Sequence, residues 1–287
     1  MAAPHAQADH PDRQTAGPRR LFDRGLHRPL EQPLHVPHQR QTDTARLRPE
    51  AQGPHPLPQA RLLPFPADVS PRAVLFDIYG TLLSSAAGEL HLDPALRDLI
   101  DKAHAASPHP FPEIDIREIH AALHPELAPE EIEALAIAHE MKANPVTPMP
   151  GAADTLRYLA AKDIPLGLIS NAQFYTVPIL EEALGASLTE LGIDPDLCCF
   201  SYLERRAKPD PCLFEILRDK FARRGIPAAN VLYIGNDVRN DIDPARATGF
   251  RTALFAGDSK SLRLRGRSLG DCGADHVIRD LRELLEL

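Results

Sequence analysis

The sequence predicts an α/β protein built on a parallel β-sheet, and three observations support that prediction. From Pro71 onward, short apolar runs alternate with longer amphipathic segments. The runs are almost wholly apolar, which is typical of strands that are covered on both faces. Polar and reactive side chains follow four of these runs, and ligands bind beyond the carboxyl ends of parallel strands. A chain of 287 residues is long enough to bury a sizeable core around such a sheet.

Each element follows from its local pattern. Apolar runs are expected to form strands at 73–76, 165–169, 197–201, 231–234, 251–255 and 276–278. Amphipathic segments are expected to form helices at 151–162, 178–191 and 209–224. Because a helix separates most successive strands, the strands are expected to run parallel, with helices on both faces of the sheet.

Residues 1–70 have a different composition from the rest of the chain. They hold 12 of the 29 prolines and 6 of the 13 histidines, with no sustained apolar period. Each proline removes a backbone donor and interrupts a helix or a sheet. We therefore predict a disordered leader over 1–70. The leader lacks the apolar stretch of a secretory signal.

Charge and composition exclude several classes of protein. The net charge of -8 argues against non-specific binding to nucleic acid or to an anionic membrane. No run of apolar residues is long enough to cross a bilayer. The four cysteines (Cys198, Cys199, Cys212 and Cys272) have no C-x-x-C spacing, so we expect buried thiols in a reducing compartment, the cytoplasm.

Between Thr81 and Ser170 lie 88 residues, far more than one crossover helix needs. Three helix signals fill this insert. Asp93 precedes Pro94, which is the order of a helix cap and a first-turn proline. Apolar stripes at 115–123 and 129–141 predict the second and third helices.

Four polar clusters follow the predicted strands. They are 77–82 (Asp-Ile-Tyr-Gly-Thr-Leu), 170–173 (Ser-Asn-Ala-Gln), 208–211 (Lys-Pro-Asp-Pro) and 235–241 (Gly-Asn-Asp-Val-Arg-Asn-Asp). An aspartate after a strand is often only a helix cap, so one such cluster alone means little. All four are expected at the same edge of one sheet, and together they predict an active site.

The residue types fit transfer of a charged group. The carboxylate of Asp77 can act as a nucleophile, as in aspartyl-phosphate chemistry. Lys208 supplies a positive charge and Ser170 a neutral donor for a transferring phosphoryl group. Asp77, Asp237 and Asp241 would repel one another without a cation. A bound Mg²⁺ would remove that repulsion, since it prefers a few carboxylates, water and a phosphate oxygen.

The four clusters in this order resemble the motifs of the haloacid dehalogenase superfamily, over residues 73 to about 280. The resemblance implies a Rossmann-like core in three layers, with Asp77 as the nucleophile. It also implies that Ser170 and Lys208 bind the transferring group, while Thr81 supports the nucleophile loop. Thr81 and Asn171 are the residues expected to contact the substrate.

The resemblance further implies a Mg²⁺ site. The metal would be held by Asp77, by the backbone carbonyl of Tyr79 and by residues of the fourth motif. Either Asn236 or Asp237 could be the first ligand of that motif, with Asp241 as the second.

The insert is expected to be the helical cap that the superfamily carries over its active site. The implied domains are a core of 71–84 and 148–287 and a cap of 85–147. A lid of this kind excludes water and selects small substrates, so the expected partner is a small molecule.

Two departures from the superfamily's patterns leave two kinds of substrate possible, a phosphate ester and a 2-haloacid. Family phosphatases usually carry a second aspartate where this chain has Tyr79, and a phenol is a poor acid-base catalyst at neutral pH. The superfamily's 2-haloacid dehalogenases resemble the Asp-x-Tyr-Gly-Thr sequence, but they work without a metal and lack the acidic fourth motif. We therefore favour a Mg²⁺-dependent phosphatase on a small metabolite. A metal-independent dehalogenase-type hydrolase and a weakly catalytic or non-catalytic binding protein are the alternatives.

Overall fold

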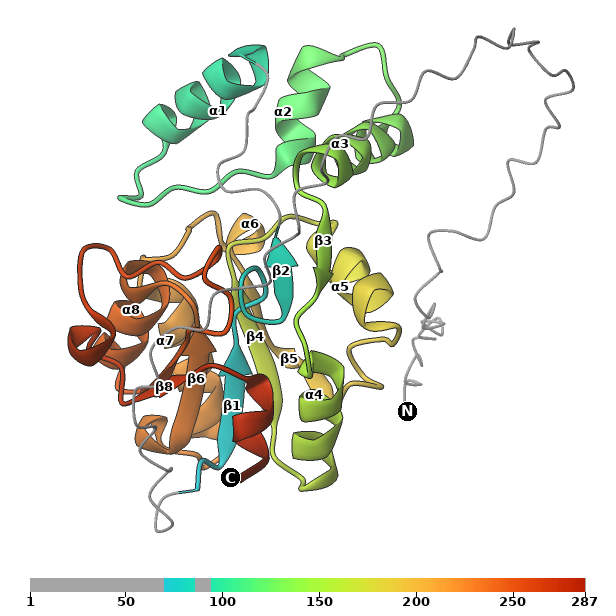
Figure 1. The fold of residues 1–287 in the computed structure, drawn as a ribbon. Helices are drawn as coiled ribbons and strands as arrows, with labels where there is room; N and C mark the ends of the chain where they lie inside the picture. The colour runs from blue at the N-terminus through green and yellow to red at the C-terminus, as the bar shows by residue number, and fades with distance from the viewer. Residues whose placement is uncertain (1–69, 86–93, 287) are drawn as a thin grey trace, which may run out of the picture. The chain divides into compact units, whose positions relative to one another are not determined.

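A computed structural model describes residues 70–85 and 94–286, and it contains a six-stranded sheet (Figure 1). The strand order is β5-β4-β1-β6-β7-β8, and every neighbouring pair is parallel. The strands are β1 (Ala73–Phe76), β4 (Leu166–Ser170), β5 (Ile193–Phe200), β6 (Val231–Gly235), β7 (Arg251–Phe255) and β8 (His276–Ile278). β1 lies between β4 and β6, where Val74 pairs with Leu166 and Leu232. The predicted parallel α/β sheet is confirmed.

Helices connect the strands. The helices that alternate with the strands of the sheet are α4 (Ala152–Ala161), α5 (Thr176–Leu184), α6 (Ser201–Glu204), α7 (Cys212–Arg223) and α8 (Asp243–Ala247). A single π-helical turn, Val238–Ile242, lies between β6 and α8. Short 3₁₀ segments are Ala228–Asn230, Leu269–Asp271 and Leu281–Glu286.

The sheet is covered on both faces, because alternate residues of β1 belong to different apolar clusters. Val74 and Phe76 pack in a cluster with leucines of α4, α5 and the last 3₁₀ segment. Ala73 and Leu75 pack in a second cluster with α7 and α8. Successive side chains of a strand point to opposite faces, so the helices form one layer on each side of the sheet. All four of these β1 side chains are completely buried.

The insert is joined to the core by a short antiparallel ribbon. β2 (Leu83–Ser85) pairs with β3 (Val146–Pro148), with Ser84 opposite Thr147. Between them lie α1 (Pro94–Ala106), α2 (Ile116–Leu123) and α3 (Pro129–Ala143). In Figure 1 these three helices lie beyond the end of the sheet from which β2 leaves β1.

Apolar stripes hold the insert together and attach it to the core. Ile119 of α2 and Ala136 of α3 are buried in one cluster with Tyr175, which precedes α5. The backbone N–H of Ile116 donates to the Gln173 side chain at 2.9 Å. Arg205, at the end of α6, pairs with Glu118 of α2. The insert therefore contacts the loops that follow β4 and β5.

The sequence pattern located the long elements and missed the short ones. The six strands and the helices at 151–162 and 209–224 are found, with ends shifted by a few residues. The helix predicted over 178–191 ends seven residues earlier, at Leu184, because Gly185 adopts a left-handed conformation that terminates it. The β2–β3 ribbon, α6 and α8 were not predicted, because three to five residues are too few to show a period. The leader predicted over 1–70 lies outside the described residues, except for Ser70, and so does the cap residue Asp93.

Among the described residues, no helix is both long and apolar enough to span a membrane.

Candidate active site

The loop that carries Asp77 is a tight turn directly after β1. The carbonyl of Ile78 accepts hydrogen bonds from the backbone N–H groups of Thr81 and Leu82, at 3.2 and 2.9 Å. Gly80 has a φ of +88°, a conformation that favours glycine. A Cβ atom at this position would also overlap the side-chain amide of Asn236. The glycine of the first motif therefore has a structural reason.

The carboxylate of Asp77 is buried and accepts two side-chain hydrogen bonds on one oxygen. Asp77 is 5% exposed. Its Oδ1 accepts from the Ser170 hydroxyl at 3.0 Å and from the Lys208 ammonium at 2.7 Å. The ends of β1 and β4 and the loop before α7 thus bring together the three residues that were predicted to be catalytic.

Lys208 joins two carboxylates. Its Nζ donates to Asp77 Oδ1 at 2.7 Å and to Asp241 Oδ1 at 2.6 Å. The Lys208 side chain is only 4% exposed. A buried charge is costly unless it is paired and hydrogen-bonded, and here the ammonium has both carboxylates as partners.

Asp241 is held by donors on both oxygens. Oδ1 accepts from Lys208 and from the hydroxyl of Tyr233, at 2.6 and 2.8 Å. Oδ2 accepts from the backbone N–H groups of Asn236 and Asp237, at 3.0 and 2.9 Å. A Cβ at Gly235 would overlap the Asp241 carboxyl group, so the glycine of the fourth motif makes room for this carboxylate.

Burial and charge shift the pKa values of this cluster. Burial, together with the charge of nearby Asp241, raises the pKa of Asp77 to about 6 against the opposing effect of the Lys208 charge. Burial by itself lowers the pKa of Lys208, but Asp241 and Asp77 outweigh it and raise the pKa above its ordinary value. Burial raises the pKa of Tyr233, and the Asp241 charge adds to the effect. Lys208 is therefore an ammonium and Tyr233 a neutral donor.

The fourth motif divides between two environments. Asn236 lies against the nucleophile loop, where its Nδ2 donates to the Ser261 carbonyl at 2.6 Å. Asp237 instead caps the π-helical turn, accepting from the N–H groups of Arg239 and Asn240. The Asp237 carboxylate is also paired with the Arg265 guanidinium at 2.5 Å.

Two of the predicted Mg²⁺ ligands, Asp237 and Asp241, are already bound by other groups. Both oxygens of Asp241 and both of Asp237 already accept hydrogen bonds, and each carboxylate has its own cationic partner. Within 70–85 and 94–286, no cluster of three or more His, Cys, Asp or Glu residues could hold a metal ion. Lys208 and Arg265 supply the charge compensation that the sequence argument assigned to a metal. The Mg²⁺ site stays a prediction.

Two residues predicted to contact substrate have structural partners. The Asn171 side chain accepts from the Lys208 backbone N–H at 2.7 Å and donates to the Lys208 carbonyl at 3.3 Å. Thr81 is completely buried, and its hydroxyl is 3.5 Å from Asn236 Oδ1. These contacts fix the loops around Asp77; Asn171 also lines the neighbouring cavity.

Tyr79 replaces the second aspartate of family phosphatases, and its surroundings keep it neutral. Its hydroxyl donates to Thr176 at 3.2 Å. Burial raises the pKa of the Tyr79 phenol, and the charges of Glu140 and Asp77 act in the same direction. Tyr79 therefore cannot serve as a base near neutral pH.

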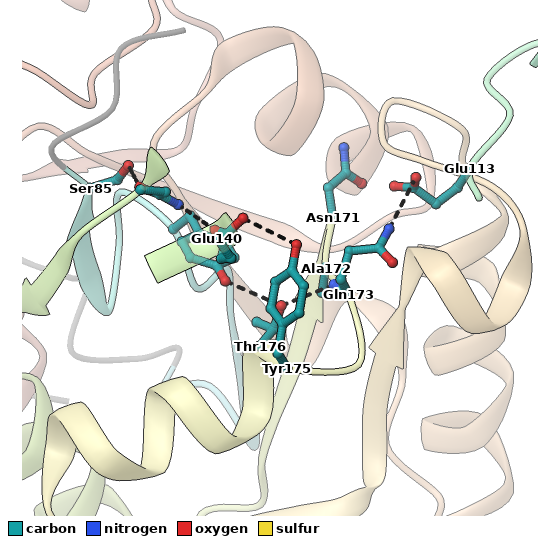
Figure 2. Close-up of a pocket in the computed structure, with 10 residues that line it drawn as sticks. Ser85, Glu113, Glu140, Asn171, Ala172, Gln173, Tyr175 and Thr176 are labelled. Atoms are coloured by element: carbon teal, nitrogen blue, oxygen red, sulfur yellow. Dashed lines mark hydrogen bonds between the residues drawn. The ribbon is translucent and has the colours of Figure 1, made fainter. Parts of the chain in front are cut away.

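A cavity of about 330 Å³ opens beside the nucleophile loop, between the core and the insert (Figure 2). Asp77 does not line it, but Tyr79 and Asn171, which follow Asp77 and Ser170 closely in the chain, both do. The lining residues are Tyr79, Ser85, Glu113, Glu140, Asn144, Asn171, Ala172, Gln173, Tyr175 and Thr176. Figure 2 shows the hydrogen bonds from the Tyr175 hydroxyl to Glu140 and from the Gln173 amide to Glu113.

Sequence reasoning missed several residues of this site. Tyr233 lies inside the apolar run of β6, and its only signal was that a buried phenol needs a hydrogen-bond partner. Arg265 lies in a loop whose sequence shows no motif, but it pairs with Asp237. Glu113 and Glu140 come from the insert, whose sequence contains no recognisable motif.

The raised pKa of Asp77 predicts how the site titrates. Because the carboxyl group is protonated below its pKa, Asp77 loses its charge as the pH falls through about 6, whereas an ordinary aspartate remains ionised there. Carboxyl ¹³C NMR of aspartate-labelled protein should show one signal that titrates near pH 6 and is absent from Asp77→Asn. A signal for Asp77 with a midpoint of about 4, the ordinary value, would contradict the described burial.

Comparison with known proteins agrees with this geometry. The sequence profile of the haloacid dehalogenase-like hydrolases matches residues 71–249. A phosphoglycolate phosphatase of Pseudomonas savastanoi pv. phaseolicola is 27% identical over 230 residues, which are 75% of this chain and 79% of that protein. Phosphoglycolate phosphatase 1 of Pseudomonas aeruginosa is 29% identical over 242 residues, covering 77% and 81%.

Among solved structures, a HAD family hydrolase from Deinococcus radiodurans R1 is similar, with a TM-score of 0.47 and 22% identity, over 76% of this chain and 94% of that one. The family profile extends from the start of β1 through the fourth motif to the end of α8, and so it includes Asp77, Ser170, Lys208 and Asp241. The chain belongs to the haloacid dehalogenase-like hydrolase family.

Proposed function

We propose that this protein is a phosphoric monoester hydrolase that acts on a small phosphorylated metabolite, with Asp77 as the nucleophile. The observation that carries the proposal is the buried Asp77 carboxylate, held on one oxygen by Lys208 and Ser170 at the carboxyl edge of the sheet. The phosphoglycolate phosphatases among its relatives support a phosphate ester as the substrate.

The arrangement suggests how the reaction proceeds. Oδ1 of Asp77 is occupied by two side-chain donors, so Oδ2 is the oxygen that attacks phosphorus. The bond from phosphorus to the ester oxygen breaks, and the alkoxide leaves with the electron pair and becomes the alcohol when it takes a proton. Water then attacks the aspartyl-phosphate, releasing inorganic phosphate and the Asp77 carboxylate. The Lys208 ammonium stabilises the negative charge of the transferring group, which is the main requirement of phosphoryl transfer.

Protonation of the leaving alcohol is the weak step of this mechanism. An alkoxide needs a proton as it leaves, and a positioned acid typically speeds such a step by about 10² to 10⁴-fold. Tyr79 stands where family phosphatases carry that acid, and its proton is held by Thr176. The leaving group therefore takes its proton from water, and esters of acidic alcohols are favoured.

We propose that α1, α2 and α3, within 85–147, act as the cap over this site. Glu140 of α3 and Glu113, before α2, line the cavity together with Gln173 and Thr176 of the core. A cavity with walls from both parts suits a small molecule better than a protein surface.

Mg²⁺ is the cofactor that family membership suggests for a phosphatase. We propose that Arg265 competes with a divalent cation for Asp237, since the arginine now occupies that carboxylate. The Arg265 side chain is 43% exposed, so it can move away without opening the core.

A dehalogenase-type hydrolase is the second candidate, favoured by Tyr79 and by the hydrogen-bonded state of Asp237 and Asp241. A halide leaves without a proton, so the lack of an acid at position 79 would cost nothing. Chloride release from 2-chloropropionate, measured beside phosphate release from p-nitrophenyl phosphate, separates the two activities.

We also propose a cytoplasmic location. All four cysteines are free thiols, two of them buried, which is consistent with a reducing compartment.

The nucleophile assignment predicts the effect of Asp77→Asn. Phosphate release from p-nitrophenyl phosphate should fall by about a thousandfold or more, because an amide cannot form the acyl phosphate. Asp154→Asn, the same change at an exposed position of α4, should leave the rate unchanged. Thermal unfolding of both variants shows whether they are folded. A folded Asp77→Asn variant with wild-type activity would exclude Asp77 as the nucleophile.

The missing acid predicts that Tyr79→Asp alters the choice of leaving group. The ratio of kcat/KM for an alkyl phosphate to that for p-nitrophenyl phosphate should rise by about tenfold or more, because only the alkyl leaving group needs a strong acid. Tyr79→Phe, which keeps the ring and removes the hydroxyl, should leave the ratio unchanged. An equal ratio in all three proteins would show that leaving-group protonation does not limit the rate.

Competition at Asp237 predicts that Arg265→Gln strengthens Mg²⁺ binding. Removing the guanidinium takes away the cation paired with Asp237, so calorimetric titration with MgCl₂ alone should give a Kd about tenfold lower than that of the wild type. Arg267→Gln, which breaks a neighbouring exposed ion pair with Asp243, serves as the matched control. Identical Kd values for all three proteins would refute the competition.

A further inference from the structure

The cavity beside the nucleophile loop has an unusual charge for a site that accepts phosphate esters. Its charged lining residues are Glu113 and Glu140, and none of the described residues that line it is Lys, Arg or His. Its other polar groups are phenols, hydroxyls and amides, from Tyr79, Tyr175, Ser85, Thr176, Asn144, Asn171 and Gln173. The leaving group of a substrate held at Asp77 would thus face acceptors that carry negative charge.

Tyr79 connects this cavity to the nucleophile. Its side chain lines the cavity, and its phenol experiences the charges of both Glu140 and Asp77. Glu140 Oε2 accepts from the Tyr175 hydroxyl at 3.1 Å, while Oε1 accepts from the Asn144 amide at 2.9 Å. Among the described residues each oxygen has one side-chain donor, and it can accept another, because a carboxylate offers about four acceptor positions.

A second cavity, of about 590 Å³, shares a wall with the first. Glu113, Glu140, Gln173 and Tyr175 line both. His120 lines the second cavity, is 1% exposed, and has no hydrogen-bond partner for its Nδ1 among the described residues. A buried polar atom without a partner costs free energy, so this nitrogen favours a ligand that offers it a hydrogen bond.

Among the described residues that line the two cavities, basic side chains are found only in the second. Lys142 lines it, together with three histidines: His104, His120 and His139. In a two-carbon leaving group such as glycolate, the carboxylate stays within about 4 Å of the ester oxygen, given ordinary bond lengths. With the leaving group in the first cavity, which Tyr79 and Asn171 join to the nucleophile site, that carboxylate would face the wall formed by Glu113 and Glu140.

We infer that the substrate's leaving group carries hydroxyl or ammonium donors and has no carboxylate beside the ester oxygen. This inference rests on the proposed phosphatase function and narrows its substrate class. It separates this chain from its relatives, whose names specify phosphoglycolate. The same charge argument disfavours 2-haloacids, which carry a carboxylate on the reacting carbon.

Three phosphate esters of equal chain length test the inference on the full-length protein. They are 2-phosphoglycolate, 2-hydroxyethyl phosphate and phosphoethanolamine, whose leaving groups are anionic, neutral and cationic. The kcat/KM for at least one of the last two should exceed that for 2-phosphoglycolate by about tenfold or more, because like charges repel at short range. Whichever of the two reacts faster distinguishes hydroxyl from ammonium recognition.

Neutralising the cavity should reduce this preference. Glu140→Gln keeps the shape of the side chain and removes its charge, so the preference over 2-phosphoglycolate should shrink by about threefold or more. Glu130→Gln, the same change at an exposed position in the first turn of α3, should leave it unchanged. If Glu140→Gln does not fold, Glu113→Gln provides the same test, and the wild-type comparison needs no variant.

The outcomes separate the two proposals. If the protein releases phosphate from p-nitrophenyl phosphate and prefers 2-phosphoglycolate to the other two esters, this inference is wrong and the phosphatase function is still supported. No release from any ester, p-nitrophenyl phosphate included, would overturn both.

Discussion

The ammonium of Lys208, buried between the carboxylates of Asp77 and Asp241, is the interaction on which the rest of the site depends. Two aspartates this close to each other in a buried site cannot both remain ionised without a cation between them. Lys208 supplies that cation at 2.7 and 2.6 Å. The surrounding groups hold the lysine in place: Asn171 fixes its backbone, and Tyr233 shares the Asp241 oxygen.

The sheet topology creates this arrangement. β1 lies at the middle of the sheet, between β4 and β6, so the ends of three parallel strands deliver Asp77, Ser170 and the Gly235–Asp241 segment to one edge. Lys208 reaches the same edge from the loop before α7. The motif glycines serve this packing, since a side chain at Gly80 or Gly235 would collide with Asn236 or Asp241. Apolar packing on both faces of the sheet fixes the strands that carry the polar groups.

Charge compensation changes the interpretation of the acidic fourth motif. Counted along the sequence, Asp77, Asp237 and Asp241 resemble a metal-binding triad. In the structure, Asp241 pairs with Lys208 and Asp237 with Arg265, and the residue that faces the nucleophile loop is the neutral Asn236. Family membership supports a hydrolase, and the geometry supports an aspartate nucleophile with a lysine partner. The insert then adds a cavity whose acidic wall limits which leaving groups fit beside that nucleophile.

The amino-acid sequence was enough to predict the parallel α/β class, the positions of most long strands and helices, and the residues at the strand ends. It could do so because apolar periodicity and strand-end chemistry are local properties of the chain. Which charges meet depends on the packing of the folded chain. The pairing of Arg265 with Asp237, across 28 positions, and the placing of Glu113 and Glu140 opposite Gln173 and Tyr175 depend on how separate elements pack. No local pattern encodes such contacts, because each of these side chains, taken alone, resembles an ordinary surface charge.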